Sequence, residues 1–386
     1  MQNSIMQNSE TEALMNPFKY GSTVSGEYFC RRPELARTLA EYVKSGQNVV
    51  MQGERRMGKT SLVLETVRAM KGVALFHADL LCVRDMADLC QRLASAFARL
   101  ETSAGFLERA LHALARLRPT LTIDPGTGAP SVSVEAAAAS QATSLESVLD
   151  AIAAYTAKHR TCVVLDEFQD VLDIDDGERV LAIMRGRIQL DSRTCYVFLG
   201  SVRNRMTDIF MHPNSPFYRG AAPLPVGEID PAAFFAFLRA RFATGRRAFP
   251  RESFDAVCAI ARNTPGDVQE LCDAIWDCTD RGTTIGEEEI RRGLDVVFSR
   301  ERDHYEIFVR RLTPLQMRVL SAIAARGGKE IYSTAFLAAA STRNAASVRR
   351  AVDRLVKEGL VFHNAAEYRF VNPFFREWIL REGRAC

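Results

Sequence analysis

Short apolar runs alternate with segments of helical periodicity up to about residue 229. A run of four to eight apolar residues predicts a strand buried on both faces, and apolar positions three and four apart predict a helix. Strands are expected at 47–52, 73–79, 161–165, 195–200 and 221–226, and helices at 33–45, 85–101, 145–158 and 178–190. Strands that alternate with helices in this way indicate an α/β fold, with a parallel sheet and helices on both faces.

The pattern changes along the chain, which predicts four parts. Residues 1–15 form a polar tail, and 16–229 form the α/β core. Within the core, the Pro-, Gly- and Ala-rich stretch 102–145 is expected to be an irregular, hairpin-like insertion. Residues 230–311 are helical only, as in a helical lid. Residues 312–386 show three short helices and two short strands, the order of a C-terminal winged helix-turn-helix.

Composition narrows the class of protein. Of 386 residues, 47% are hydrophobic and 25% are charged, which is typical of a soluble globular protein. The net charge of +3 gives no argument for nucleic acid unless basic residues cluster locally. No apolar window of membrane-spanning length and no signal peptide is apparent, so a cytoplasmic protein without a membrane partner is expected. The nine cysteines form no C-x-x-C pair, and we expect reduced core residues.

One loop carries the strongest chemical signal. The segment from Gly53 to Thr60 matches G-x-x-x-x-G-K-[ST] at every fixed position and lies between a predicted strand and a predicted helix. Its glycines let successive backbone N–H groups face a phosphate, Lys59 reaches the β- and γ-phosphates, and the Thr60 hydroxyl suits Mg²⁺. The expected nucleotide-binding residues are Gly53, Glu54, Arg55, Arg56, Met57, Gly58, Lys59, Thr60 and Ser61.

An acidic pair follows another predicted strand. The run Cys162–Leu165 ends at Asp166 and Glu167, which is the pattern of a Walker B strand. Asp166 is expected to hold Mg²⁺, and Glu167 to orient and deprotonate the attacking water. Because ligands of open α/β sheets bind at the carboxyl ends of the strands, both acids are expected beside the phosphate loop. ATP or ADP with Mg²⁺ is therefore the predicted ligand.

These two motifs, GERRMGKTSLV and VVLDEFQD, give the chain a family resemblance. It resembles AAA+-related ATPases of the STAND class, in particular the archaeal ATPases, which are similar in architecture to archaeal origin-recognition ATPases. The resemblance extends from about Asn16 to Trp378. It includes the segment Cys30–Leu35, similar to the G-R-x-x-E-L opening beside the adenine pocket, with Cys30 in place of the usual Gly.

The resemblance also implies further site residues. Ser201, after a core strand, matches the polar residue that senses the γ-phosphate, although a helix cap is the equally open alternative. Arg219 matches the position of an arginine finger, with Arg203 and Arg205 as competitors and a surface ion pair as the other interpretation. In the lid, Gln269 stands where origin-recognition ATPases carry an arginine that contacts the γ-phosphate. An amide cannot compensate phosphate charge, which favours slow turnover or a nucleotide-held switch.

The C-terminal module contains a basic helix. Arg350, Arg354 and Lys357 share one face of the third predicted helix, opposite the apolar Val348 and Val352. Such a face suits double-stranded DNA, with the helix in the major groove. A solvated helix in a domain used for protein contacts is the alternative, since winged helices of STAND proteins often contact proteins.

Together these features predict an ATP-binding AAA+/STAND-type ATPase that works as a nucleotide-controlled switch. Mg²⁺-dependent hydrolysis would be coupled to repositioning of the winged-helix domain. Two other hypotheses stay open: a DNA-binding winged-helix protein with largely structural nucleotide, and a scaffold that binds ATP without hydrolysing it. A protein partner or a homo-oligomer is compatible with each of them.

Overall fold

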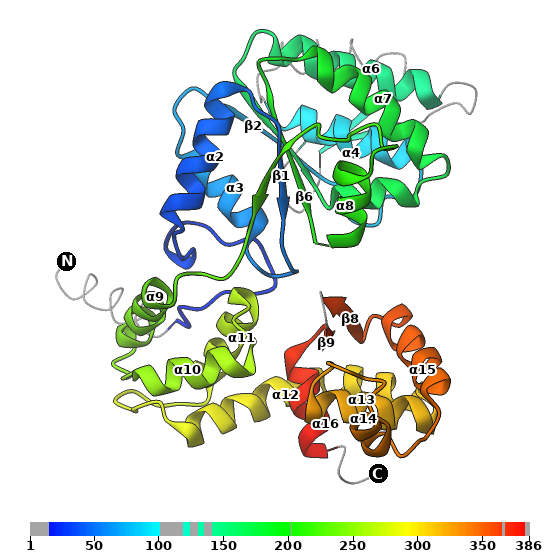
Figure 1. Cartoon of the computed structure of the whole chain (residues 1–386). Coiled ribbons are helices and arrows are strands. Elements are labelled where there is room, and N and C mark those ends of the chain that lie inside the picture. Colours follow the sequence, from blue (N-terminus) through cyan, green and yellow to red (C-terminus); the bar gives the residue numbers. More distant parts are fainter. Residues whose placement is uncertain are drawn as a thin grey trace, which may run out of the picture. The chain divides into compact units, whose positions relative to one another are not determined.

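The structure is a computed structural model that describes residues 15–100, 119–123, 130–134, 141–201, 203–364 and 367–382 (Figure 1). The chain divides into two compact units. The sheet unit runs from Thr23 to Glu228, and the helical unit combines the segment ending at Ser22 with everything from Ile229 onward. Residues 16–22, which the sequence analysis places in the core, thus belong with the lid and the winged helix.

The sheet unit is built on five parallel strands in the order β2-β5-β6-β1-β7. All five lie where apolar runs predict them, within a residue or two at each end. Their bounds are β1 Val49–Gln52, β2 Ala74–Asp79, β5 Thr161–Asp166, β6 Cys195–Gly200 and β7 Ala222–Pro225. The first and second strands of the chain are not neighbours, because β5 and β6 are inserted between them. This order brings the carboxyl ends of β1, β5 and β6 together.

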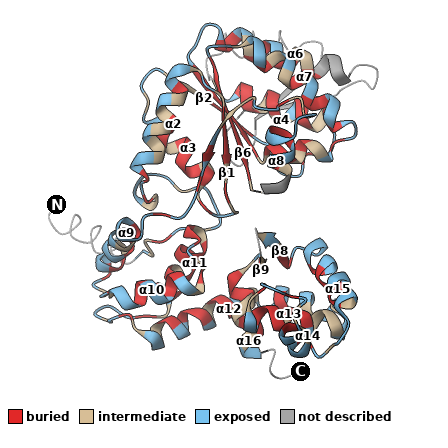
Figure 2. Ribbon diagram, viewed as in Figure 1, coloured by how far each residue is buried: buried red, intermediate tan, exposed pale blue. Residues whose placement is uncertain are grey.

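Helices cover both faces of this sheet, as the fold class requires. Two of them pack on one face, through a core in which Leu39 and Leu62 meet Met51 and Val197. They are α2 Pro33–Ser45 and α3 Lys59–Arg68. The opposite face is covered by α4 Met86–Ala98, α6 Gln141–Thr156, α7 Gly177–Leu190 and α8 Arg203–Met211. Figure 2 shows the central strands buried along their length, as expected for continuous apolar runs.

The insertion expected at 102–145 is described only in part. It contains an antiparallel pair of strands, β3 Pro119–Ile123 and β4 Pro130–Val134, which is the hairpin that the sequence suggested. The helix α6 begins at Gln141, inside the range assigned to the insertion. The other residues of the stretch lie outside the described residues.

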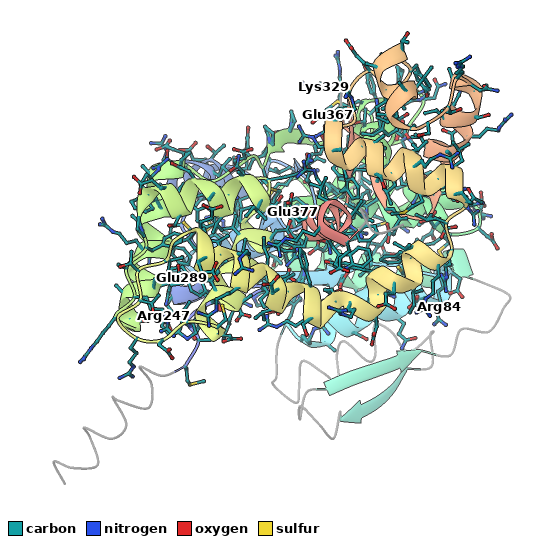
Figure 3. The ribbon with its side chains drawn as sticks, turned by 90° about the horizontal axis from the view of Figure 1, so that it is seen from below. Arg84, Arg247, Glu289, Lys329, Glu367 and Glu377 are labelled. Atoms are coloured by element: carbon teal, nitrogen blue, oxygen red, sulfur yellow. The ribbon has the colours of Figure 1, made fainter. Side chains whose placement is uncertain are left out.

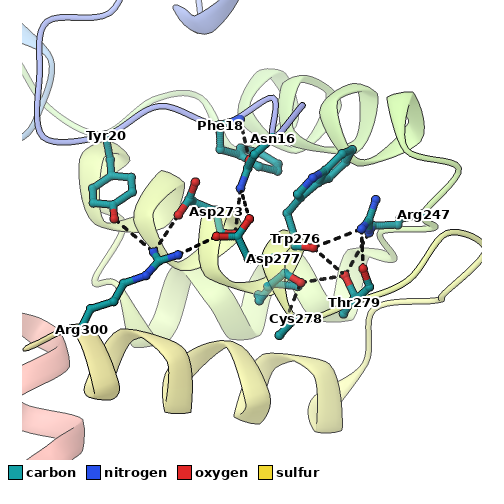
Figure 4. Close-up of polar contacts among 11 residues, drawn as sticks. Asn16, Phe18, Tyr20, Arg247, Asp273, Trp276, Asp277, Cys278, Thr279 and Arg300 are labelled. Carbon is teal, nitrogen blue, oxygen red and sulfur yellow. Dashed lines mark hydrogen bonds and ion pairs between the residues drawn. The ribbon is translucent and has the colours of Figure 1, made fainter. Parts of the chain in front are cut away.

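The helical unit begins with four lid helices. They are α9 Pro231–Thr244, α10 Arg251–Ile260, α11 Pro265–Asp277 and the long α12 Glu287–Arg310. The N-terminal segment of the chain lies on these helices (Figure 4). Asn16 Nδ2 donates to the Asp277 carboxylate at 2.8 Å, Phe18 is 4% exposed against Phe242, and the Tyr20 hydroxyl accepts from Arg300 at 3.1 Å. The segment from Asn16 to Tyr20 therefore packs with the lid.

The winged helix completes this unit and follows the predicted order of elements. Its bounds are α13 Pro314–Arg326, α14 Thr334–Ala339, α15 Ala345–Lys357, β8 Val361–Asn364, β9 Glu367–Phe370 and α16 Pro373–Glu382. Thr313 caps the first of these helices, and its hydroxyl accepts from Gln316 N. A bridge between Gly328 and Tyr368 joins the turn after α13 to the wing, so that Lys329 and Glu367 lie close together (Figure 3).

The winged helix is packed on the end of the lid. Tyr305, in the second half of α12, is 1% exposed, and its ring lies 5.0 Å from Phe375 and 5.6 Å from Trp378, both in α16. Arg381 of α16 pairs with Asp295 of α12 at 2.6 Å. One continuous helix and these contacts make the lid and the winged helix a single body.

No helix in the described part of the chain is long and apolar enough to cross a membrane.

Candidate active site

The phosphate-binding loop follows β1 directly, as its motif predicts. A Cβ added to Gly53 would lie 2.6 Å from the carbonyl oxygen of Val226, so only glycine fits where the loop leaves the sheet beside β7. Gly58 has φ +80°, a left-handed conformation that favours glycine at the start of α3. The two fixed glycines of the motif therefore serve two different needs, a close approach and a left-handed turn.

Lys59 lies inside the loop and is 7% exposed. Its ammonium group donates to the carbonyl oxygens of Gly53 at 3.0 Å and Glu54 at 2.9 Å. Burial lowers the pKa of Lys59, and the negative charges of Glu167 and Asp166 oppose this effect. The buried cation is thus held at the centre of the loop by acceptors that a phosphate group can replace.

Thr60 and Asp166 meet across the site. The Thr60 hydroxyl donates to Asp166 Oδ2 at 2.6 Å, and the Nε2 atom of His77, on β2, lies 3.6 Å from the same oxygen. Burial raises the pKa of Asp166, but the nearby His77 ring and the hydrogen bond from Thr60 outweigh burial, so that its pKa lies below the ordinary value. Asp166 is therefore a carboxylate at neutral pH. His77 shares no local motif with Asp166, so the sequence alone does not predict that the two lie together.

Glu167 is fixed at the carboxyl end of β5. Its backbone is left-handed, with φ +50°, and it opens a 3-10 helix, η3 Phe168–Asp173. Its Oε2 atom accepts a hydrogen bond from the Ser201 hydroxyl at 2.7 Å and another from Gln169 Nε2 at 2.6 Å. Ser201 follows β6, the neighbour of β5, so the sheet order places the hydroxyl beside the acid. Ser201 thus contacts Glu167, and so does Gln169, which belongs to no motif that predicts this contact.

A second buried group that the motifs did not reveal is Arg32. It is 7% exposed and donates to the carbonyl oxygens of Met57, in the loop, at 2.9 Å and of Gly227 at 2.7 Å. Burial lowers the pKa of its guanidinium. Its neighbour Arg31 is exposed. A basic residue next to Pro33 gives no signal of burial, because this arrangement depends on contacts between distant segments.

Among the described residues, neither Arg219 nor Arg205 contacts this cluster. Arg219 is exposed, with φ +53° and its guanidinium 5.3 Å from the Tyr218 ring centroid, and no contact joins it to the phosphate loop among the described residues. Arg205 forms a two-pronged ion pair with Asp173. The side chain of Arg203 lies outside the described residues. In the lid, Gln269 is 6% exposed, and its Oε1 atom has no hydrogen-bond partner in the described part of the chain.

The basic face of α15, defined by Arg350, Arg354 and Lys357, is exposed, as Figure 2 shows for this side of the helix. Val348 and Val352 on the other side are fully buried. The Arg354 guanidinium pairs with the Glu358 carboxylate one turn later. This ion pair leaves Arg350 and Lys357 as the stronger contributors to positive charge on this face.

The donor set fits a divalent cation and a nucleotide. Thr60 and Asp166 present hard oxygen atoms 2.6 Å apart at the start of α3, where backbone N–H groups and the helix dipole favour phosphate. These are the oxygen ligands that Mg²⁺ accepts. Elsewhere, the residues that the structure describes contain no group of three or more His, Cys, Asp or Glu side chains placed to hold a metal.

Comparison with known proteins agrees with this architecture. A family model described as "Probable winged helix domain" matches residues 303–381, which begin inside α12. The Walker-type ATPase of Pyrococcus abyssi is similar at 18% identity and a TM-score of 0.59, over 92% of this chain and 97% of that one. The ORC2 protein of Aeropyrum pernix is similar at 14% identity and a TM-score of 0.50, over 97% and 98%. A search of curated protein sequences found no match.

The fold and the loop geometry define the class. The chain has the fold of a P-loop ATPase, with a five-stranded parallel sheet between helices, a helical lid and a C-terminal winged helix. At sequence identities of 18% and 14%, the similarity to these two structures establishes the fold alone. The resemblance to archaeal Walker-type and origin-recognition ATPases that the motifs suggested is confirmed at that level.

Proposed function

We propose that this protein is an Mg²⁺-dependent ATPase of AAA+/STAND type in which the state of the nucleotide controls the position of the winged helix. The observation that carries the proposal is the cluster of Lys59, Thr60, Asp166 and Glu167 at the start of α3 and the end of β5. These four residues are of the types, and lie at the positions of the fold, that the transfer of a phosphoryl group to water needs. The similar ORC2 structure is described with ADPNP and ADP.

Each side chain has a distinct task in this mechanism. The N–H groups of the loop and the Lys59 ammonium bind the β- and γ-phosphates. Thr60 and Asp166 would hold Mg²⁺, which supplies electrostatic stabilisation of the phosphate oxygens. Glu167 accepts the proton of the water that attacks the γ-phosphorus, and Ser201 fixes the Glu167 carboxylate by its hydrogen bond of 2.7 Å.

The coupling to the winged helix follows from the helical unit. The contacts of Tyr305 and the Arg381–Asp295 pair join α16 to α12, so that a displacement of the lid carries the basic face of α15 with it. Gln269 in place of an arginine favours a nucleotide that is held for long and hydrolysed slowly. A switch rather than a fast motor is the behaviour that we propose.

The first experiment replaces Lys59 by Ala and measures ATP affinity by calorimetry. Loss of a buried charge partner should weaken ATP binding by roughly 10- to 100-fold. The exposed Lys71, replaced by Ala in the same unit, is the matched control and should leave affinity unchanged. Equal affinities of the Lys59 variant and wild type would contradict the assigned loop.

The second experiment separates binding from hydrolysis. The Glu167→Gln variant should bind ATP normally, but its rate of hydrolysis should fall by about 100-fold or more, because the amide cannot accept the proton. Equal turnover of the variant and wild type would refute the role of Glu167. If wild type binds ATP and releases no phosphate in the presence of Mg²⁺, the protein is the non-hydrolysing scaffold.

Arg219 is the proposed arginine finger, and its exposure suits a residue offered to a neighbouring subunit. Arg219→Ala should then lower turnover per subunit at protein concentrations at which wild type assembles. The assay is phosphate release at several protein concentrations, followed with light scattering. Unchanged turnover in the assembled state would remove Arg219 from the site.

A second candidate function is binding of double-stranded DNA, favoured by the exposed basic face of α15 within a winged helix. Replacing its three residues by Ala should weaken duplex binding and lower the logarithmic salt slope by about 0.9 for each phosphate that the variant no longer binds. The control replaces three exposed lid arginines, Arg239, Arg281 and Arg302. If the wild-type protein binds no duplex at low salt, DNA binding is refuted and the winged helix is assigned to protein contacts.

A further inference from the structure

The carboxylate of Glu167 is anchored through one of its two oxygens. Both hydrogen bonds to its side chain, from Gln169 Nε2 at 2.6 Å and from Ser201 Oγ at 2.7 Å, end on Oε2. Two donors on one oxygen fix the rotation of the carboxylate and leave Oε1 for another partner. The strained, left-handed backbone of Glu167 and the buried side chain of Phe168 hold the acid at this position.

Gln169 is itself held with little freedom. It is 1% exposed, and its Nε2 atom also donates to Asp170 Oδ1 at 2.9 Å, while the other oxygen of Asp170 accepts from the backbone of Cys82 at 2.7 Å. Two carboxylate acceptors on one side of the amide determine which end faces them, because an amide oxygen there would meet two negative groups. The side-chain amide therefore presents its N–H groups to Glu167 by necessity.

The space around the amide is also shaped for it. A Cβ on Gly200, at the end of β6, would lie 2.4 Å from Met206 Cγ and 2.7 Å from Gln169 Oε1, so glycine next to Ser201 makes room for both of these side chains. Gln169 Oε1 is buried without a hydrogen-bond partner among the residues that the structure describes. A buried acceptor left unsatisfied costs free energy, so a purely structural role favours an apolar residue here. The N–H contact with Glu167 explains the amide.

We propose that Gln169 is a positioning residue for hydrolysis, which holds Oε2 of Glu167 so that Oε1 is the atom that accepts the proton of the attacking water. The inference rests on the proposed ATPase function. In the step, the water oxygen bonds to the γ-phosphorus as its proton passes to Oε1. The bond from the γ-phosphorus to the bridging oxygen breaks, and ADP leaves with that electron pair. The proton on Glu167 then returns to solvent.

The test uses two substitutions in the full-length protein. Gln169→Met keeps the length of the side chain but removes the donor, and should lower kcat about 10- to 100-fold with the Kd for ATP within twofold of wild type. Gln169→Glu can donate only while it is protonated. It should therefore show a new loss of kcat as pH rises, when a third carboxylate repels Glu167 and Asp170. The exposed Gln91, replaced by Met, is the matched control.

The outcomes separate this inference from the proposed function. If wild type hydrolyses ATP, Glu167→Gln stops it, and both Gln169 variants keep the kcat and the pH profile of wild type, the positioning role is refuted and the ATPase stands. If wild type releases no phosphate, both proposals fail together. Should thermal melting show that the Met variant does not fold, the pH profile of the isosteric Glu variant decides. A purely structural role predicts that kcat and the melting temperature are lost together at high pH, whereas the positioning role predicts that kcat falls while the fold is retained.

Discussion

Arg32 provides a sharp test of how the phosphate loop is held in place. Its buried guanidinium bonds to the carbonyl oxygen of Met57 in the loop and to that of Gly227, at the end of the sheet unit. Replacing Arg32 by Met keeps most of the buried aliphatic volume but removes both bonds. The side chain that ties the loop to the segment after β7 is then gone, so both stability and nucleotide affinity should fall.

The size of the effect follows from the geometry. A hydrogen bond from a charged donor contributes about 1.5–3 kcal/mol, and the variant lacks two of them. Part of this cost is recovered because a partly desolvated charge, whose pKa burial has lowered, is no longer buried. We therefore expect the free energy of unfolding of the sheet unit to fall by about 2–4 kcal/mol. For a domain of this size that lowers its Tm by roughly 5–15 °C.

The neighbouring Arg31 supplies the matched control. It is exposed, so Arg31→Met changes the same charge without touching the loop and should stay within about 0.5 kcal/mol of wild type. Stability is measured by hydrogen exchange of the amides from Val49 to Arg68, and affinity by calorimetry with ATP. Both tryptophans lie in the helical unit, so their fluorescence shows that this unit stays folded. Equal behaviour of the two variants would refute the reasoning.

Two further predictions concern stability. Phe18→Ala should lower the free energy of unfolding of the helical unit by about 3–5 kcal/mol, because Phe18 packs on Phe242 and Trp276. The measurement is urea unfolding followed by tryptophan fluorescence. The control, Met15→Ala at a 72% exposed position, should leave this free energy unchanged. Although burial raises the pKa of Asp88, its hydrogen bonds with Arg92 and the Arg84 backbone lower it below the ordinary 3.8. The stability that Asp88 contributes is therefore fully present above about pH 4 and is lost as the pH falls through its lowered folded-state pKa. Asp88→Asn and wild type should differ in urea unfolding at pH 7, and the difference should shrink as the pH is lowered below that pKa. A difference that stays constant through the acid series would contradict this.

The sequence by itself determined the fold class and predicts the centre of the candidate site, because both depend on local patterns. Continuous apolar runs predict the five strands, since a parallel sheet is buried on both faces. The phosphate loop needs glycine, lysine and threonine at fixed spacing, so its residues are readable from Gly53 to Thr60. Asp166 and Glu167 follow from the strand that they end. The cap of α13 is also a local feature, because Thr313 and its partner Gln316 are three residues apart.

The tertiary structure alone decided which distant groups support that centre. Ser201 and Glu167 meet across 34 residues because β5 and β6 are neighbours in the sheet. Arg32 donates to the backbone carbonyl oxygen of Gly227, 195 residues away, and Asn16 binds Asp277, 261 residues away, which joins the segment around Asn16 to the lid. In each contact the local sequence of both partners is compatible with full exposure. Only the packing of the sheet and the helices brings the partners within hydrogen-bond distance, where desolvation makes the pairing matter.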